Sequence, residues 1–279
     1  MKIISFINMK GGVAKTTLTV NIADCLNRRH DARVLVVDVD PQFNATQCLL
    51  APEKYIEHVN EGGCTIIDVF DRKSRASVGV VEGEKVVESR ELDQVEPVEI
   101  RDGLDLLPGA LDLFRLEMAP GEGRENRLKR YFSTLTDDYD YILIDTPPTP
   151  SVWMTSALIA SDYYVIPVRP DPISLTGIDL LRNIVREKAD NFDLRTQCAG
   201  VVLTVVETNT NVYKAARQNL ENHDFWSSKL FRHHLRKRVA VATNQLKQQT
   251  IIDTGDDDPI REIAQITREL ISRTGTDDV

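Results

Sequence analysis

Residues 8–17 have the sequence NMKGGVAKTT, and this stretch predicts a phosphate-binding loop. The preceding run, Lys2–Ile7, favours a short strand, whereas Leu18–Leu26 has a large apolar residue at every fourth position, as a helix requires. Gly11 and Gly12 have no Cβ, so their backbone N–H groups can approach phosphate oxygens closely. The chain therefore passes from a strand through a glycine turn into a helix.

The end of this stretch supplies the charged and polar groups that a bound nucleotide needs. Lys15 places a positive charge near the β- and γ-phosphates, and the Thr16 hydroxyl is available to Mg²⁺. The amides that open the following helix add the favourable end of its dipole. The plain alternative is a glycine turn that precedes an amphipathic helix.

The loop departs from the common G-x-x-x-x-G-K-[ST] pattern, because Met9 and Ala14 occupy the two glycine positions. It fits the deviant pattern K-G-G-x-x-K-[ST]-T, and in this it resembles the ParA/MinD family of partition and positioning ATPases. The resemblance implies that Lys10 reaches across a dimer interface to the partner's nucleotide. The family usually has glycine where Ala14 stands, and a methyl group is the smallest departure from it. The predicted nucleotide-binding residues are Lys10, Gly11, Gly12, Val13, Ala14, Lys15, Thr16 and Thr17.

The length is compatible with one domain that spans residues 1–279, and the loop and the family resemblance imply that this is a P-loop ATPase domain. A chain of 279 residues with 42% hydrophobic content can bury a substantial core. The net charge of −9 argues against a broadly basic nucleic-acid-binding surface. The four cysteines show no C-x-x-C spacing, so neither a zinc site nor a disulfide framework is expected, and a reducing cytoplasm is the simplest setting. No apolar run approaches the about 20 residues of a membrane span.

Two carboxylates follow the next predicted strand. Arg33–Val37 is a run rich in β-branched residues, typical of a parallel strand buried on both faces, and it leads into Asp38 and Asp40. Open α/β sheets bind ligands at the carboxyl ends of their strands, although an acidic loop before a proline turn is the alternative. The segment resembles the family's D-x-D-P-Q-G-N-A-T, with Phe43 in place of the glycine. By that resemblance Asp40 positions the attacking water and Asp38 supports the metal shell.

A third carboxylate ends the run Tyr141–Asp145, which has the sequence YILID and precedes two prolines. The run resembles the family's Y-D-Y-I-L-I-D-x-P-P, in which the aspartate holds Mg²⁺ through a water molecule. Asp145 is therefore expected to pair with Thr16 around the ion. The predicted metal-binding residues are Thr16, Asp38, Asp40 and Asp145, and the predicted catalytic residues are Lys10, Lys15 and Asp40.

Strand and helix patterns alternate along the rest of the chain. Further strands are expected within Leu104–Gly109, Tyr163–Val168 and Ala199–Val206, and further helices over Leu175–Glu187 and Pro259–Arg273. This alternation predicts an α/β fold with a doubly wound, mostly parallel sheet and helices on both faces, as in a P-loop NTPase. Residues 71–100 are rich in charge and are predicted to form a surface excursion.

One basic segment stands out in this acidic chain. No acidic residue lies between Asp224 and Asp253, where lysine and arginine are frequent. A solvated basic loop is the alternative. The family resemblance implies DNA contacts without sequence preference near this position, although in Phe231–Arg236 only Arg236 aligns with the family's I-P-R-N-V-R. The predicted DNA-binding residues are Lys214, Arg217, Arg232, Arg236, Lys237 and Arg238.

The resemblance favours a ParA-type ATPase with ATP and Mg²⁺ as ligands. Such a protein forms a homodimer with ATP, binds DNA non-specifically, and drives plasmid or chromosome partition with a ParB-like centromere-binding partner that stimulates a weak intrinsic ATPase. This interpretation places it in the cytoplasm on the nucleoid, and the acidic end Thr276–Val279 argues against membrane binding.

Other functions stay open beside this one. The main alternative is a MinD-like or cargo-positioning ATPase of the same family that does not bind DNA. An electron-transfer role needs paired cysteines, which the chain lacks. A nucleotide-binding scaffold without catalysis is disfavoured because Asp40 and Asp145 are both present.

Overall fold

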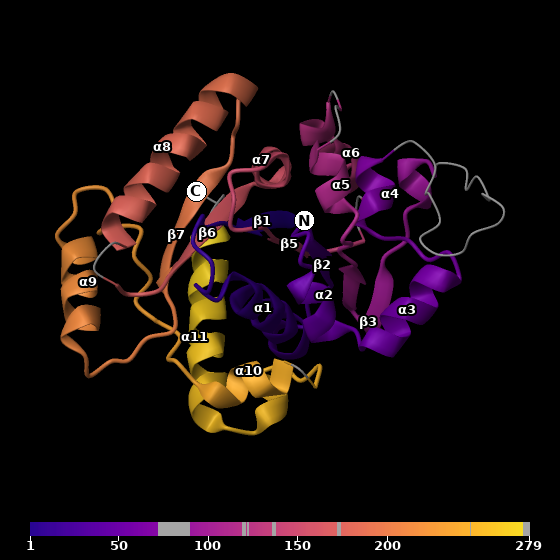
Figure 1. Ribbon diagram of the computed structural model, residues 1–279. Coiled ribbons are helices and arrows are strands. Elements are labelled where there is room, and N and C mark those ends of the chain that lie inside the picture. Colours follow the sequence, from indigo (N-terminus) through magenta and orange to yellow (C-terminus); the bar gives the residue numbers. More distant parts are fainter. Residues whose placement is uncertain are drawn as a thin grey trace.

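The computed structural model describes residues 1–71, 90–118, 121, 123–135, 138–171, 174–245 and 247–275. These residues form a seven-stranded sheet with the order β3-β4-β2-β5-β1-β6-β7 (Figure 1). Every strand pair in it is parallel except β3 with β4. The strands are β1 (Lys2–Phe6), β2 (Val34–Asp38), β3 (Val98–Arg101), β4 (Leu104–Leu107), β5 (Tyr141–Asp145), β6 (Tyr163–Val168) and β7 (Gln197–Leu203).

Helices cover both faces of this sheet, as Figure 1 shows. The α-helices of the described residues are α1 (Lys15–His30), α2 (Asn44–Leu49), α3 (Pro52–Asn60), α4 (Ile66–Phe70), α5 (Leu113–Met118), α6 (Arg127–Phe132), α7 (Val152–Ala160), α8 (Ser174–Phe192), α9 (Asn211–Glu221), α10 (Val239–Gln245) and α11 (Asp257–Thr274). Short 3-10 helices occur at η1 (Leu92–Gln94), η2 (Arg124–Asn126) and η3 (Ile252–Thr254). The predicted doubly wound, mostly parallel α/β fold is confirmed.

The two faces follow from the side-chain alternation of the strands. In β2, Val34 and Val36 point into a core formed with α1, α2 and α11. Leu35 and Val37 point to the opposite side, into a core formed with α4, α5, α6 and α7. Since successive side chains of a strand alternate between faces, a continuous apolar run is what a doubly covered strand requires.

The last strand differs from its prediction. The sequence favours Ala199–Val206, whereas β7 ends earlier, at Leu203. Two residues explain the end of the strand: Val205 has a left-handed φ of 52°, and the Thr204 hydroxyl donates to the Val13 carbonyl at 2.8 Å. The end of β7 is thereby attached to the phosphate loop.

The predicted surface excursion at about 71–100 is only partly described. Residues 72–89 lie outside the described residues. The expectation of a surface segment is wrong near its end, because Val95 is buried in the core and β3 forms the antiparallel edge of the sheet. Val98 and Ile100 pack against the core below β3 and account for its position. Among the described residues, no helix is long and apolar enough to span a bilayer.

Candidate nucleotide-binding site

The phosphate loop connects β1 to the amino terminus of α1. Gly12 and Ala14 both have left-handed backbones, with φ values of 71° and 60°. Ala14 is the residue before α1, and no side chain caps the helix there, so its first N–H groups are available to an anion. A Cβ added to Gly11 or Gly12 would meet no atom within 4 Å, which means that the space above the loop is open. The glycine-like geometry is therefore kept at Ala14 despite the methyl group.

Lys15 is the buried cation of this loop. Its Nζ donates to the Asn8 carbonyl at 3.2 Å, so the side chain folds back over its own loop. Burial lowers the pKa of Lys15, and the nearby carboxylates Asp145 and Asp40 oppose that effect. A desolvated cation next to an open space is a strong site for an anionic oxygen.

Thr16 and Asp145 meet as the sequence predicts. The Thr16 Oγ1 donates to Asp145 Oδ2 at 2.6 Å, and the Thr19 hydroxyl lies 3.4 Å from the other carboxylate oxygen. Asp145 lies opposite Asp38 across the β2 and β5 pair, at the carboxyl ends of both strands. Burial raises the pKa of Asp145.

These hard oxygen donors fit Mg²⁺. Among the described residues no group of three or more His, Cys, Asp or Glu side chains could hold a metal on its own. A magnesium ion here would therefore take its remaining ligands from nucleotide phosphates and water, which is how proteins usually bind it.

Asp38 and Asp40 differ in how they face the site. Asp38 is fully buried, and its Oδ2 accepts from both the backbone N–H and the hydroxyl of Thr46, each at 2.8 Å. Its Oδ1 accepts from the Asp40 N–H at 3.2 Å. Burial, with a contribution from Asp145, raises its pKa well above the usual range. Asp40 lines the pocket and accepts from the Gln42 N–H, so the structure brings Asp40, and not Asp38, to the ligand space.

The pocket over the phosphate loop has a volume of about 430 Å³. Among the wall residues that the sequence did not predict, two come from the far end of the chain. Gln245 of α10 donates to the Thr17 hydroxyl at 3.2 Å, and Gln248 donates to the Gln47 carbonyl at 3.1 Å. More than 200 residues separate these glutamines from the groups they contact. Only the folded chain reveals them, since a glutamine at the end of α10 and another after it carry no motif.

Lys10 stands apart from the pocket. Its side chain is 52% exposed, and its amine pairs with Asp171, which follows β6. Unlike Lys15, it does not face the phosphate space of its own subunit.

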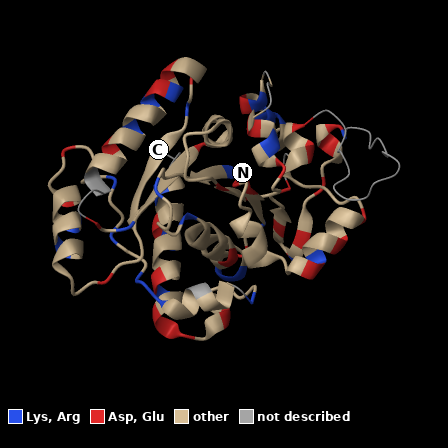
Figure 2. Cartoon of the chain, viewed as in Figure 1, with Lys and Arg blue, Asp and Glu red and all other residues tan. Residues whose placement is uncertain are grey.

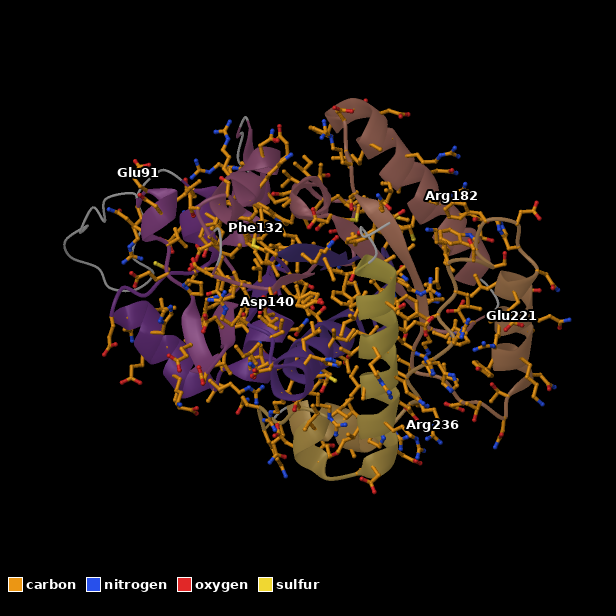
Figure 3. The ribbon with its side chains drawn as sticks, turned by 180° about the vertical axis from the view of Figure 1, so that it is seen from behind. Glu91, Phe132, Asp140, Arg182, Glu221 and Arg236 are labelled. Atoms are coloured by element: carbon orange, nitrogen blue, oxygen red, sulfur yellow. The ribbon has the colours of Figure 1, made fainter. Side chains whose placement is uncertain are left out.

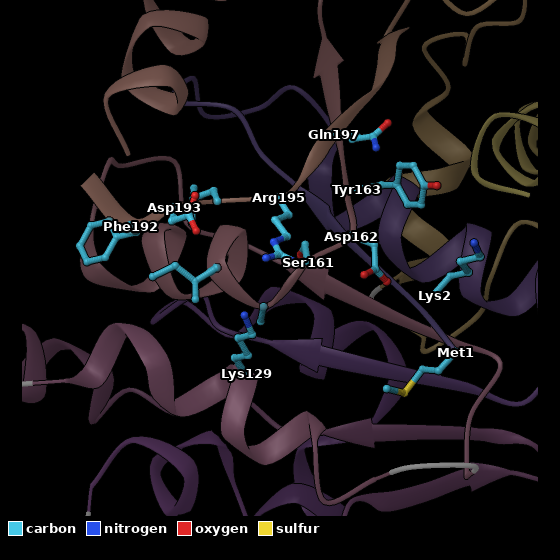
Figure 4. A pocket seen from close by; sticks show the side chains of 13 residues that line it. Met1, Lys2, Lys129, Ser161, Asp162, Tyr163, Phe192, Asp193, Arg195 and Gln197 are labelled. Atoms are coloured by element: carbon cyan, nitrogen blue, oxygen red, sulfur yellow. The ribbon is translucent and has the colours of Figure 1, made fainter. Parts of the chain in front are cut away.

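A larger cavity, of about 700 Å³, lies elsewhere (Figure 4). It opens at the amino ends of β1, β6 and β7, where Lys2, Tyr163 and Gln197 line it. Lys129 of α6 and Arg195 also border it. None of the predicted site residues lies there, so the chemistry of the loop, and not the size of the hollow, locates the candidate site.

Most of the predicted DNA-binding cations are already in ion pairs. Figure 2 shows blue and red segments intermingled, and Figure 3 places Arg236 beside α11. Glu262 of α11, whose side chain is only 9% exposed, accepts from both Arg236 and Arg238. The pairs are Arg217 with Glu221, Arg236 with Glu262 and Asp258, Lys237 with Glu207, and Arg238 with Glu262 and Asp256.

Lys214 and Arg232 are the exceptions. Neither side chain forms an ion pair with another described residue, and both are exposed. They lie on neighbouring segments, because Arg217 of α9 donates to the Arg232 carbonyl at 3.4 Å and the ring of Tyr213 contacts that of His234. The free positive charge of this region is thus smaller than the sequence suggests.

Comparisons with known proteins find similar sequences. A family model described as an AAA domain matches residues 1–197. The sporulation initiation inhibitor protein Soj of Bacillus subtilis is 37% identical over 215 residues, which cover 76% of this chain and 75% of that protein. A ParA family protein of Chlamydia pneumoniae is 34% identical over 192 residues, or 67% of this chain and 66% of that protein.

The fold also has solved counterparts. The structure of a plasmid partition protein of Borrelia burgdorferi B31 bound to AMPPNP matches with a TM-score of 0.75. The match covers 98% of this chain and 99% of that chain at 23% identity, and it shows a shared fold.

Proposed function

The chain belongs to the ParA/MinD family of ATPases, and from that membership we propose that it is a magnesium-dependent ATP hydrolase of the partition type. One observation carries the proposal: Lys15, Thr16 and Asp40 line one open pocket at the strand ends, and the buried Asp145 accepts a hydrogen bond from Thr16. In the proposed cycle ATP joins two copies of the chain, and hydrolysis, stimulated by a ParB-like partner, separates them. The proposed location is the cytoplasm, on the nucleoid.

Each side chain of the pocket has a proposed role. Lys15 and the loop amides would neutralise the β- and γ-phosphates, and Thr16 with Asp145 would hold Mg²⁺. When bound, the ion supplies positive charge to the phosphate oxygens that gain negative charge during hydrolysis. Asp40 orients the attacking water. Asp38 has the proposed role of supporting the metal shell indirectly. Its carboxylate accepts from the backbone N–H groups of Asp40 and Thr46 and thereby fixes the loop that carries Asp40.

Lys10 has the proposed role of joining the two subunits. In the single chain its amine is neutralised by Asp171, at an exposed position. In the ATP-bound dimer we propose that it leaves Asp171 and contacts the partner's nucleotide. The exchange is feasible because an exposed ion pair contributes little, about 0–1 kcal/mol.

The proposal also includes DNA binding by the few cations that have no acidic partner among the described residues. Lys214 and Arg232 retain charge for phosphates, whereas Arg236 and Arg238 have acidic partners in α11. A single chain would therefore neutralise few phosphates and bind weakly, while a dimer doubles the number of contacts. The alternative, a positioning ATPase without DNA binding, is favoured by the same ion pairs, because they leave little net positive charge.

A DNA-binding assay with ATP, with ADP and without nucleotide decides between these functions. Binding that requires ATP, ignores sequence and weakens steeply with salt supports the partition function. Simultaneous Lys214→Glu and Arg232→Glu changes should abolish binding while ATP binding persists. Lys54→Glu with Arg186→Glu is the matched control, because it makes the same charge change at exposed positions on α3 and α8.

Two results would favour the positioning alternative. One is a parent protein that does not bind DNA in ATP at low salt. The other is equal loss of binding in the control pair, which would mean that net charge matters and that the α9 surface does not.

A further inference from the structure

Phe43 has a backbone conformation that bulky residues rarely adopt. It lies three residues after Asp40 and has φ and ψ of 41° and 44°, in the left-handed region. Glycine adopts this conformation without strain, whereas a residue with a large side chain does so only at an energetic cost. Strained residues persist where surrounding contacts over-determine them, so the contacts of the Phe43 side chain are informative.

Tyr55 of α3 supplies the main contact. The two rings are stacked, with centroids 5.5 Å apart and planes 13° from parallel. The Tyr55 hydroxyl donates to the Gly109 carbonyl at 3.1 Å, beyond the end of β4. No residue of α3 is itself buried, so Tyr55 joins an otherwise superficial helix to the loop that carries Asp40.

Gly109 closes a ring of contacts around this loop. A Cβ on Gly109 would lie 2.7 Å from the Phe43 Cβ, so the two backbones approach as closely as glycine permits. The Gly109 N–H donates to the Thr46 hydroxyl at 2.8 Å, and that hydroxyl donates to Asp38. The Phe43 N–H donates to the Asp40 carbonyl at 2.7 Å. The loop is therefore held from both of its ends.

We propose that Phe43 and Tyr55 are positioning residues for hydrolysis, and that their stacked rings hold the loop so that the Asp40 carboxylate faces the γ-phosphate. The inference rests on the proposed ATP hydrolysis at this site. Because an error of about 1 Å in a reacting geometry can cost about 100-fold in rate, a loosened loop slows the chemical step. The phosphate loop binds ATP without these rings, so affinity is unaffected.

Steady-state kinetics with ATP and Mg²⁺ test the proposal. Phe43→Ala and Tyr55→Ala should each lower kcat about tenfold and leave KM within about twofold. The double variant should lose no more than either single change, since one contact is removed in all three. Phe43→Tyr keeps a ring and should restore kcat to within about twofold. Ile56→Ala, on the exposed side of α3, is the matched control and should not change kcat.

Amide hydrogen exchange tests the same contact without activity. The Phe43 N–H should exchange about fivefold faster in Tyr55→Ala than in the parent protein, and at the parent rate in Ile56→Ala. A parent protein that does not hydrolyse ATP would end the proposed function, whereas the exchange result would still decide whether Tyr55 orders the loop. Additive losses in the double variant, a Phe43→Tyr variant as slow as Phe43→Ala, or unchanged exchange would each overturn the positioning role.

Discussion

The phosphate loop and the basic segment 229–238 both carry cations, but different groups face them. Lys15 contacts a backbone carbonyl and borders an open pocket, so its charge is directed at a ligand space. Arg236 and Arg238 face Glu262, a nearly buried carboxylate of α11 that both of them contact. The comparison shows that the partners of a cation, and not the density of cations along the chain, decide whether it is available to a ligand.

Removing Lys15 tests the first half of the comparison and should have the largest effect. Lys15→Ala removes the desolvated cation beside the phosphates, and the loss of such a charged partner weakens binding by about 100-fold or more. Calorimetric titration with ATP and Mg²⁺ measures it. Lys10→Ala is the control: its side chain is exposed and paired with Asp171, so ATP affinity should stay within about threefold while dimerisation fails. Micromolar binding retained by Lys15→Ala would contradict the assignment.

The second prediction separates binding from chemistry at the same pocket. Asp40→Ala should leave ATP bound and lower kcat by about 100-fold or more, because an orienting carboxylate is lost at the attacking water. Phosphate release measures turnover, and size-exclusion chromatography should show a dimer that persists in ATP. Turnover within about threefold of the parent would assign the water to another residue.

The third prediction concerns the basic segment. Arg236→Ala should lower the free energy of unfolding by about 1–2 kcal/mol, since Glu262 keeps Arg238 but loses Arg236, whose side chain is 36% exposed. Lys214→Ala should change it by at most about 0.5 kcal/mol, as exposed positions do. In the DNA-binding assay Lys214→Ala should have the larger effect of the two variants. It should reduce the slope of DNA affinity against salt concentration by about one phosphate contact. Equal losses of unfolding free energy in Arg236→Ala and Lys214→Ala, measured by urea unfolding, would contradict the proposed difference between paired and free cations.

The sequence could predict where the candidate phosphate and metal residues lie because strands fix their positions. Buried apolar runs show where β2 and β5 end, and parallel pairing then places Asp38 opposite Asp145. The direction of each side chain could not be predicted from the sequence. Nothing in the order of residues shows that Asp38 turns inward to Thr46 while Asp40 faces the pocket.

Contacts between distant segments could not be predicted at all. Glu262, the acidic partner that Arg236 and Arg238 share, lies on α11, 26 and 24 residues later, and a count of local charge does not include it. Gln245 reaches Thr17 across 228 residues, which depends on the whole topology of the sheet. The stack of Phe43 on Tyr55 likewise needs the turn between α2 and α3.

The smallest effect is expected at Ala14 in the phosphate loop. This residue has a left-handed backbone conformation, which alanine disfavours. Ala14→Gly removes a left-handed L-residue, which relieves about 1–2 kcal/mol, and adds unfolded-state entropy that costs about 0.4–1 kcal/mol. The net expectation is a stabilisation of about 0.5 kcal/mol in urea unfolding. Gly12→Ala is the converse change, at a φ of 71° with no atom within 4 Å of the new methyl group, so it should destabilise through backbone strain alone. If Ala14→Gly instead destabilised the chain, the left-handed backbone of Ala14 would not be a source of strain. The conformation of the loop would then depend on the hydrogen bond from the Thr204 hydroxyl to the Val13 carbonyl.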